Sequence, residues 1–136
     1  MSQSTPDRLI ELLKPPAINA CSNAHAPYSR FPVGAALLTD GEDVFVGCNV
    51  ENASYGLTIC AERNALAQAM ANGATPGSIE ALLIYTPGDV VHSPCGACRQ
   101  VMHELLADQA IVISCCDGEG YSRWTVEQLM PDPFEF

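Results

Sequence analysis

Two cysteine clusters that lie far apart in the sequence constrain this chain more than any other feature. The first places Cys60 two residues before Glu62, and the second is Cys95-x-x-Cys98, directly after Pro94. A catalytic zinc ion has three protein ligands and a fourth position open to water, and cysteine sulfur is among its preferred ligands. The three cysteines can supply such a site, which leaves Glu62 free to move protons. The fold must then bring both clusters to one pocket.

Both clusters are expected at the starts of helices. Cys95 and Cys98 lie three residues apart, so a helix places their sulfurs on one face, and the small residues between them let the backbone approach a metal. Cys60 and Glu62 would lie about 200° apart around a regular helix, so they can face one pocket only where a helix begins. Unpaired backbone N–H groups at a helix start also favour the thiolate over the thiol.

A Cys-x-x-Cys pair alone has other interpretations. It is also found as a redox pair and as half of a structural zinc site. A closed structural site needs a fourth ligand, for which His92 and Cys48 are the nearest candidates, and neither has a standard spacing. Pro94 before the pair and Cys60-Ala61-Glu62 upstream favour the open, catalytic arrangement.

The motifs around the cysteines resemble those of the small, zinc-dependent cytidine deaminases. Four segments carry the resemblance in the family's order, and they are residues 26–36, 47–52, 60–63 and 94–98. The resemblance covers residues 24–134. It implies a hydrolase that converts cytidine and 2′-deoxycytidine to uridine and 2′-deoxyuridine with release of ammonia, in pyrimidine salvage, using one Zn²⁺ per subunit in a homotetramer.

For the metal site, the resemblance makes Cys60, Cys95 and Cys98 the zinc ligands and Glu62 the catalytic proton shuttle. Three thiolates around Zn²⁺ leave a net charge of about −1, which weakens the metal as a Lewis acid unless neighbouring groups donate to the sulfurs. The resemblance assigns that donation to Arg63. Arg99 either assists in the same way or is a charge on the helix surface.

For substrate binding, the resemblance implies six residues. Asn49 and Glu51 lie two apart at a strand end, so their side chains can point the same way, and an amide with a carboxylate suits a ribose 3′-hydroxyl. Phe31 is implied to pack on the pyrimidine ring and the backbone around Ala61 to hold its edge. The last two, Tyr55 and Phe134, are implied to reach a site at a subunit interface.

The charge of the chain argues against a polyanionic substrate. The formal net charge is −10, with only six Lys and Arg among 136 residues. Nucleic-acid binding depends on clustered basic residues, so we expect no nucleic-acid partner and a free nucleoside as substrate.

Length and composition predict one globular, cytoplasmic domain over residues 1–136, made of an N-terminal helical segment (1–23) and the motif region (24–134). Hydrophobic residues make up 48% of the chain, which is typical of a folded protein with a core. No apolar run has the length of a membrane span, and residues 1–7 lack the features of a signal peptide. The four cysteines outside the motifs are expected to be plain thiols, and they are Cys21, Cys48, Cys115 and Cys116.

The periodicity predicts an α/β layered domain around one central sheet, and the resemblance specifies three layers, α-β-α, with a mixed five-stranded sheet. Predicted strands cover 33–39, 44–48, 79–85 and 111–115, and predicted helices cover 57–72 and 95–107. Thr125-x-x-Gln128 predicts a capping box that opens a last short helix.

The N-terminal segment is predicted to be interrupted. Thr5-Pro6-Asp7 is typical of a helix start, and Pro15-Pro16 should end that helix because the residue before a proline is pushed out of the α region. A second short helix is then expected over 16–22. The family usually has one unbroken helix here.

Two further functions stay open at this stage. The same zinc motifs occur in a deaminase of the nucleoside antibiotic blasticidin S, although the segments 31–34 and 49–52 favour plain cytidine. A non-catalytic zinc-binding module would require the closed four-ligand site. His25, His92 and His103 are not expected to be ligands.

Overall fold

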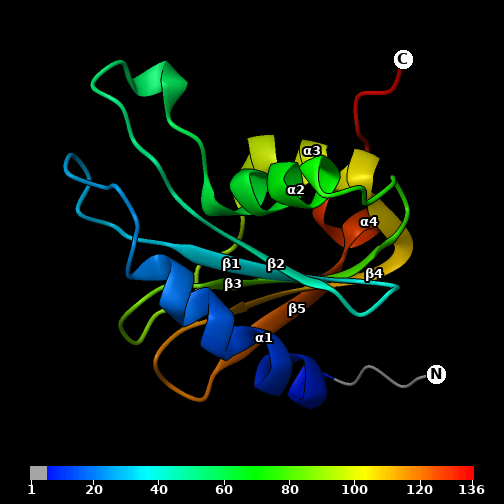
Figure 1. The fold of residues 1–136 in the computed structure, drawn as a ribbon, viewed down its shortest axis with the longest axis horizontal. Helices are drawn as coiled ribbons and strands as arrows, with labels where there is room; N and C mark the ends of the chain where they lie inside the picture. Colours follow the sequence, from blue (N-terminus) through cyan, green and yellow to red (C-terminus); the bar gives the residue numbers. More distant parts are fainter. Residues whose placement is uncertain (1–5) are drawn as a thin grey trace.

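A mixed five-stranded sheet forms the middle layer of the structure, a computed structural model that describes residues 6–136 (Figure 1). The strand order is β2-β1-β3-β4-β5, in which β3 and β4 are parallel and all other neighbours are antiparallel. The strands are β1 (Gly34–Thr39), β2 (Val44–Cys48), β3 (Ile79–Tyr85), β4 (Leu106–Cys115) and β5 (Tyr121–Thr125). All six residues of β1 are buried, because helices cover both faces of the sheet.

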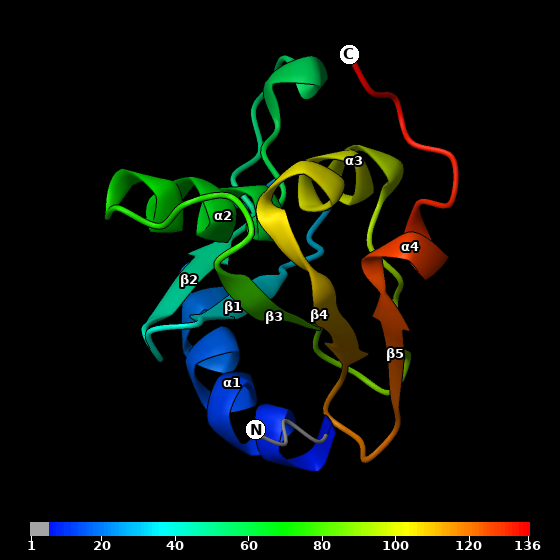
Figure 2. The same cartoon turned by 90° about the vertical axis from the view of Figure 1, so that its right-hand side faces the viewer.

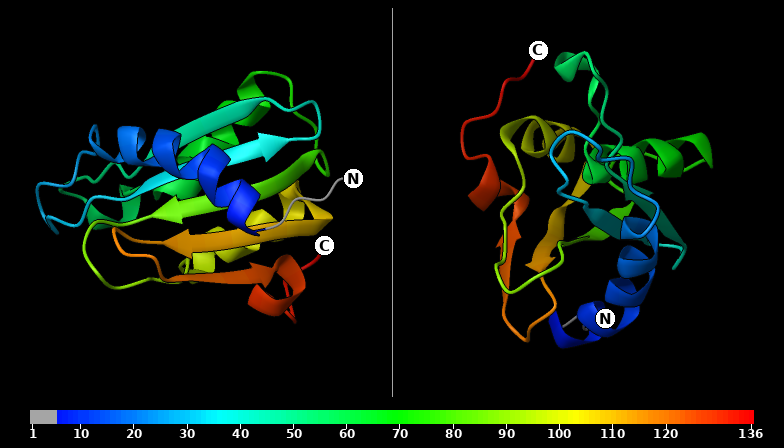
Figure 3. Two further views of the ribbon diagram at one scale, coloured as in Figure 1. Left: turned by 90° about the horizontal axis from the view of Figure 1, so that it is seen from below. Right: turned by 90° about the vertical axis from the view of Figure 1, so that its left-hand side faces the viewer.

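The helices divide into two outer layers. One face is covered by α1 (Pro6–Cys21), which lies across the strands (Figure 3). The other face carries α2 (Ala61–Ala71), α3 (Gly96–Leu105) and α4 (Val126–Leu129), as Figure 2 shows. The short 3-10 helix η1 (Tyr55–Leu57) stands away from the sheet. Over residues 6–136, no helix combines the length and apolarity that crossing a bilayer requires.

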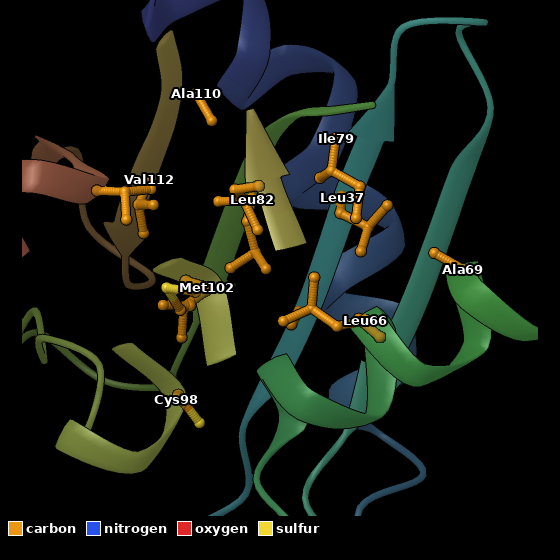
Figure 4. Packing of buried hydrophobic residues seen from close by; sticks show 14 of the residues in the cluster. Leu37, Leu66, Ala69, Ile79, Leu82, Cys98, Met102, Ala110 and Val112 are labelled. Atoms are coloured by element: carbon orange, nitrogen blue, oxygen red, sulfur yellow. The ribbon is translucent and has the colours of Figure 1, made fainter. Parts of the chain in front are cut away.

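Two apolar clusters, one on each face of the sheet, hold the layers together. Leu37 and Leu82 of the sheet pack with Leu66 of α2 and Met102 of α3, all at most 1% exposed (Figure 4). On the other face, alternate strand residues pack on α1. The predicted three-layer arrangement is therefore confirmed.

The prediction that Pro15-Pro16 ends the first helix is wrong. A single helix, α1, runs from Pro6 to Cys21 with both prolines inside it. Its buried residues continue across them at helical spacing, and they are Leu9, Leu13, Ala17, Ala20 and Cys21. The prolines remove the N–H partners of the Glu11 and Leu12 carbonyls, but these two residues lie on the exposed face, where water can satisfy them. Burial of the apolar row outweighs the local preference. Thr5, the proposed start signal, lies outside the described residues.

Other boundaries differ by a few residues, each for a local reason. The helix predicted from 57 begins at Ala61, because Ile59 pairs with Val50 in an isolated bridge and Cys60 is extended. The helix predicted over 95–107 is α3, which ends at Leu105 because β4 already begins at Leu106. Strand β5, which no apolar run predicts, is an edge strand of mostly exposed or half-buried residues. The predicted capping box is confirmed, since Thr125 and Gln128 exchange side-chain to backbone hydrogen bonds.

Gly47 of β2 lets the first turn of α2 lie directly on the sheet. A Cβ atom at this position would lie 2.4 Å from the Ala65 nitrogen and 2.6 Å from the Ala61 carbonyl oxygen. Both are backbone atoms of α2, so either the helix or strand β2 would have to shift to make room. Because α2 begins directly after Cys60, this contact also sets the position of the first cysteine cluster.

We predict that Gly47→Ala lowers the free energy of unfolding by about 2–3 kcal/mol, the upper range for overpacking a core, and lowers zinc content. Gly41→Ala is the matched control, because its Cβ would meet nothing closer than 3.9 Å, and it should change stability by less than about 0.5 kcal/mol. Urea unfolding and metal analysis measure both effects. Equal stability of the two variants would contradict the packing argument.

Candidate active site

Three cysteine sulfurs converge where α2 and α3 begin. Cys60 is the N-cap residue of α2, Cys95 is the N-cap residue of α3, and Cys98 lies in the first turn of α3. Their Sγ atoms all lie within 4.8 Å of one another, and those of Cys60 and Cys95 are 3.7 Å apart. The expected placement of both clusters at helix starts is confirmed.

The geometry of this group suits a tetrahedral zinc ion. Two sulfurs bound at about 2.3 Å with tetrahedral angles lie about 3.8 Å apart, close to the observed separation of Cys60 and Cys95. Within residues 6–136 the group consists of these three cysteines, and neither His92 nor Cys48 belongs to it. Three sulfur ligands leave one tetrahedral position for water or substrate, as the sequence predicts for a catalytic site.

Hydrogen bonds and charge prepare Cys60 to be a thiolate. A hydrogen bond from the Cys98 thiol, helped by Arg63 and Cys95, lowers the pKa of Cys60 to about 5. The same interaction with Cys60, together with burial, raises the pKa of Cys98. A bound divalent cation would favour the thiolate at all three positions.

Arg63 contacts the ligand group directly. Its Nη2 donates to the Cys60 Sγ over 3.4 Å, and hydrogen bonding to this sulfur raises the pKa of the guanidinium. Arg63 is three residues beyond Cys60 in α2, so its side chain can return to the helix start. A fixed positive charge thus lies against one sulfur of the three-cysteine group, where the resemblance places Arg63.

Glu62 is a buried carboxyl beside the sulfurs. It is 5% exposed and lies at the second position of α2. Burial raises its pKa, because the charged carboxylate loses hydration there. A carboxyl whose pKa is moved toward neutrality can both take up and release a proton.

A pocket of about 420 Å³ opens over the metal site. Its wall includes Cys60, Cys95 and Glu62 together with four of the six predicted substrate-binding residues, which are Phe31, Asn49, Glu51 and Ala61. The other two, Tyr55 and Phe134, do not line it. Tyr55 is 76% exposed on η1, where it lines an adjoining hollow with Ser29 and Glu51, and Phe134 is 73% exposed in the C-terminal segment.

Asn49 and Glu51 hold the segment that carries Phe31. Asn49 Oδ1 accepts from the Val33 N–H and its Nδ2 donates to the Phe31 carbonyl, both over 2.9 Å. Glu51 accepts from the Tyr28 and Ser29 backbone N–H groups at 2.9 and 3.1 Å, and from the Ser29 hydroxyl. That hydroxyl, with the backbone donors, lowers the pKa of Glu51. The sequence did not predict this role of Asn49 and Glu51. The role depends on contacts between residues 49–51 and residues 28–33, which are far apart in the chain.

Two other residues have roles that the sequence did not resolve. The His92 ring lines the pocket and stands edge-on to Phe31, with ring centroids 5.0 Å apart and planes at 86°. The sequence signal that could have indicated this place in the pocket is the position of His92 directly before Ser93-Pro94-Cys95. Within residues 6–136, the hydrogen bonds of Arg99 go to backbone carbonyls rather than to the sulfurs. Its Nε donates to the Pro94 carbonyl over 2.8 Å and its Nη1 to the Leu129 carbonyl over 3.3 Å.

Comparison with known proteins agrees with this geometry. A family model described as the cytidine and deoxycytidylate deaminase zinc-binding region matches residues 9–115. The cytidine deaminase of Halalkalibacterium halodurans is 46% identical over 125 residues, which are 91% of this chain and 92% of that protein. That of Sporosarcina psychrophila is 39% identical over 126 residues, 92% of this chain and 90% of that protein.

Structural comparison gives the same result. The crystal structure of cytidine deaminase from Burkholderia pseudomallei is 45% identical and superposes with a TM-score of 0.86, covering 96% of this chain and 100% of that chain. Cytidine deaminase from Mycobacterium tuberculosis, 37% identical, superposes with a TM-score of 0.79 over 93% of this chain and 97% of that chain. With three cysteines that could hold one zinc ion at the starts of α2 and α3, this chain belongs to the cytidine and deoxycytidylate deaminase zinc-binding family.

Proposed function

We propose that this protein deaminates cytidine and 2′-deoxycytidine hydrolytically, giving uridine and 2′-deoxyuridine with release of ammonia in pyrimidine salvage. The observation that carries the proposal is the buried Glu62 carboxyl beside the three sulfurs, at a pocket walled by Phe31. All seven cysteines are free thiols, which suits the reducing conditions of the cytoplasm as its location.

Cys60, Cys95 and Cys98 would hold one zinc ion, which when bound lowers the pKa of a water molecule and so makes it a nucleophile near neutral pH. Glu62 takes a proton from the attacking water and gives it to ring N3, while the oxygen bonds to C4. Glu62 then carries the second proton to the amino group, which leaves as ammonia when the C4–N bond breaks. One carboxyl thus acts as base and then as acid, which its raised pKa favours.

The pocket residues orient the nucleoside. Phe31 offers a ring face to the pyrimidine, and the N–H of Ala61, the first residue of α2, lacks an intrahelical partner and can donate to the edge of the base. Asn49 and Glu51 bind the ribose 3′-hydroxyl while they brace the segment of Phe31. The backbone near Ser93, which also lines the pocket, helps to hold the base.

We predict that Glu62→Gln binds zinc normally but loses at least about 1,000-fold in kcat, because the amide cannot transfer the protons. The loss of cytosine absorbance on addition of cytidine measures turnover, and metal analysis measures zinc. Glu104→Gln, an exposed position on α3, is the matched control and should retain full activity. Substantial turnover by Glu62→Gln would remove Glu62 from the mechanism.

The pocket favours a nucleoside over a nucleotide, although the family model's description names deoxycytidylate deaminases as well. Among the described residues that line the pocket, none is Lys or Arg, and Glu51 supplies a carboxylate. The net charge of −10 adds to the repulsion of a phosphate. The substrate is therefore the uncharged nucleoside.

We predict that kcat/KM for cytidine exceeds that for cytidine 5′-monophosphate by at least about 100-fold at low salt, since a phosphate would lie near a carboxylate without a cation. Steady-state assays of both compounds with the same preparation test this. Comparable turnover of the nucleotide would mean that a phosphate site has been overlooked.

We infer that the protein is a homotetramer whose sites are completed by neighbouring subunits. Tyr55 and Phe134, with Leu57 at 65% exposure, form exposed apolar surface that lies outside the chain's own pocket. Large apolar side chains with this much exposure are expected to be covered at an interface. The resemblance implies that Tyr55 and Phe134 reach a partner's site.

We predict that co-expressed Glu62→Gln and Tyr55→Ala subunits form hybrids more active than either parent, because some sites would then contain an intact Glu62 and a neighbour's intact Tyr55. Two affinity tags isolate the hybrids, and sedimentation velocity establishes their size. Hybrids no more active than the average of the parents, or a fully active monomer, would contradict shared sites.

A further inference from the structure

The C-terminal segment, residues 130–136, is fastened along α3 by side chains of that helix. Gln100 Nε2 donates to the Phe134 carbonyl over 2.9 Å, and the Phe134 N–H donates to Gln100 Oε1 over 3.3 Å. His103 Nε2 lies 2.9 Å from Glu135 Oε2. Figure 2 shows the segment rising from α4 past α3 to the C-terminus.

The Gln100 contact fixes the backbone of Phe134 and leaves its ring free. A neutral side-chain amide has both a donor and an acceptor, so it can pair with the N–H and the C=O of a single residue. The ring itself remains 73% exposed. Because so little of its apolar surface is buried, it adds little to the stability of the isolated chain. The interaction therefore orients an aromatic side chain that this subunit does not use in its own pocket.

The same helix also supplies part of the proposed metal site. Cys98 is one of the three sulfur ligands, and the next residue, Arg99, bonds the Pro94 carbonyl beside Cys95 and the Leu129 carbonyl at the end of α4. Gln100 follows directly and holds Phe134. Three consecutive residues of α3 thus fix the metal ligands, the loop before them and the C-terminal segment relative to one another.

We propose that Gln100 is a positioning residue that sets the Phe134 ring for a neighbouring subunit's nucleoside site. The proposal rests on the proposed function, because it requires subunits that share sites. Gln100 acts through Phe134 alone and touches neither substrate nor metal. Its removal should therefore weaken substrate binding and leave the chemical step intact.

Gln100→Glu is the sharpest variant, because it keeps the shape and the oxygen that accepts from the Phe134 N–H. It replaces the donor by a carboxylate oxygen facing the Phe134 carbonyl, so one hydrogen bond becomes a repulsion. The KM for cytidine should rise about fivefold, a modest effect in keeping with one neutral hydrogen bond, while kcat changes less than twofold and zinc content stays constant. Gln68→Glu on the exposed side of α2 is the control for added charge and should match the wild type.

A double-mutant cycle with Phe134→Ala separates positioning from a general structural effect. Phe134→Ala should raise KM by itself, and adding Gln100→Glu should raise it no further, because the ring to be positioned is gone. Additive effects on KM, a loss mainly in kcat, or a loss of zinc from Gln100→Glu would overturn the proposal. If Phe134→Ala leaves KM unchanged, the proposal also fails, whereas the deaminase assignment still stands on the Glu62→Gln result.

Discussion

The site depends on two helices that begin close together, beyond the carboxyl ends of β2 and β3. Strand β1 is antiparallel to both β2 and β3, so β2 and β3 run in the same direction. Their last residues, Cys48 and Tyr85, both pair with Gly34. The chain therefore leaves both strands at the same end of the sheet. The segments that follow lead to Cys60 and Cys95, which are placed as N-caps where backbone N–H groups are unpaired. Sheet topology brings the distant cysteines together, and the close contact of Gly47 with α2 then sets the position of Cys60.

The sequence was most informative where chemistry fixes the spacing. Cys60 with Glu62, and Cys95 with Cys98, predicted two helix starts around one metal, because regular helix would turn Cys60 and Glu62 away from each other. It was misleading at Pro15-Pro16, where a local rule for ending a helix was correct in isolation but weaker than the burial of Leu9, Leu13 and Ala17 against the sheet. The sequence did not predict edge strand β5, because this strand buries too few side chains to show an apolar pattern.

The parts of the site that the sequence could not predict are contacts between distant segments. The family resemblance implied Asn49 and Glu51 as ribose ligands, but their hold on residues 28–33 appears only when β2 ends beside that segment. His92 was considered only as a metal ligand, yet its ring forms part of the pocket wall against Phe31. Side-chain chemistry limits what a residue can do, and only the fold decides which partner it meets.

Two arginines close to the cysteines show how similar positions acquire different tasks. Arg63 follows its N-cap cysteine by three residues and returns to the Cys60 sulfur, where its charge would offset the net charge of about −1 that three thiolates leave on a bound zinc ion. Arg99 follows Cys95 by four residues, and its guanidinium instead bonds two backbone carbonyls, of Pro94 and Leu129. A planar group with several fixed N–H directions can bridge two carbonyls, whereas the single ammonium of lysine cannot hold the same fork. At the start of α2, the charge of Arg63 acts on the Cys60 sulfur. At the start of α3, the shape of Arg99 holds the backbone in place. Substitutions of the two arginines should therefore affect the proposed metal site in different ways.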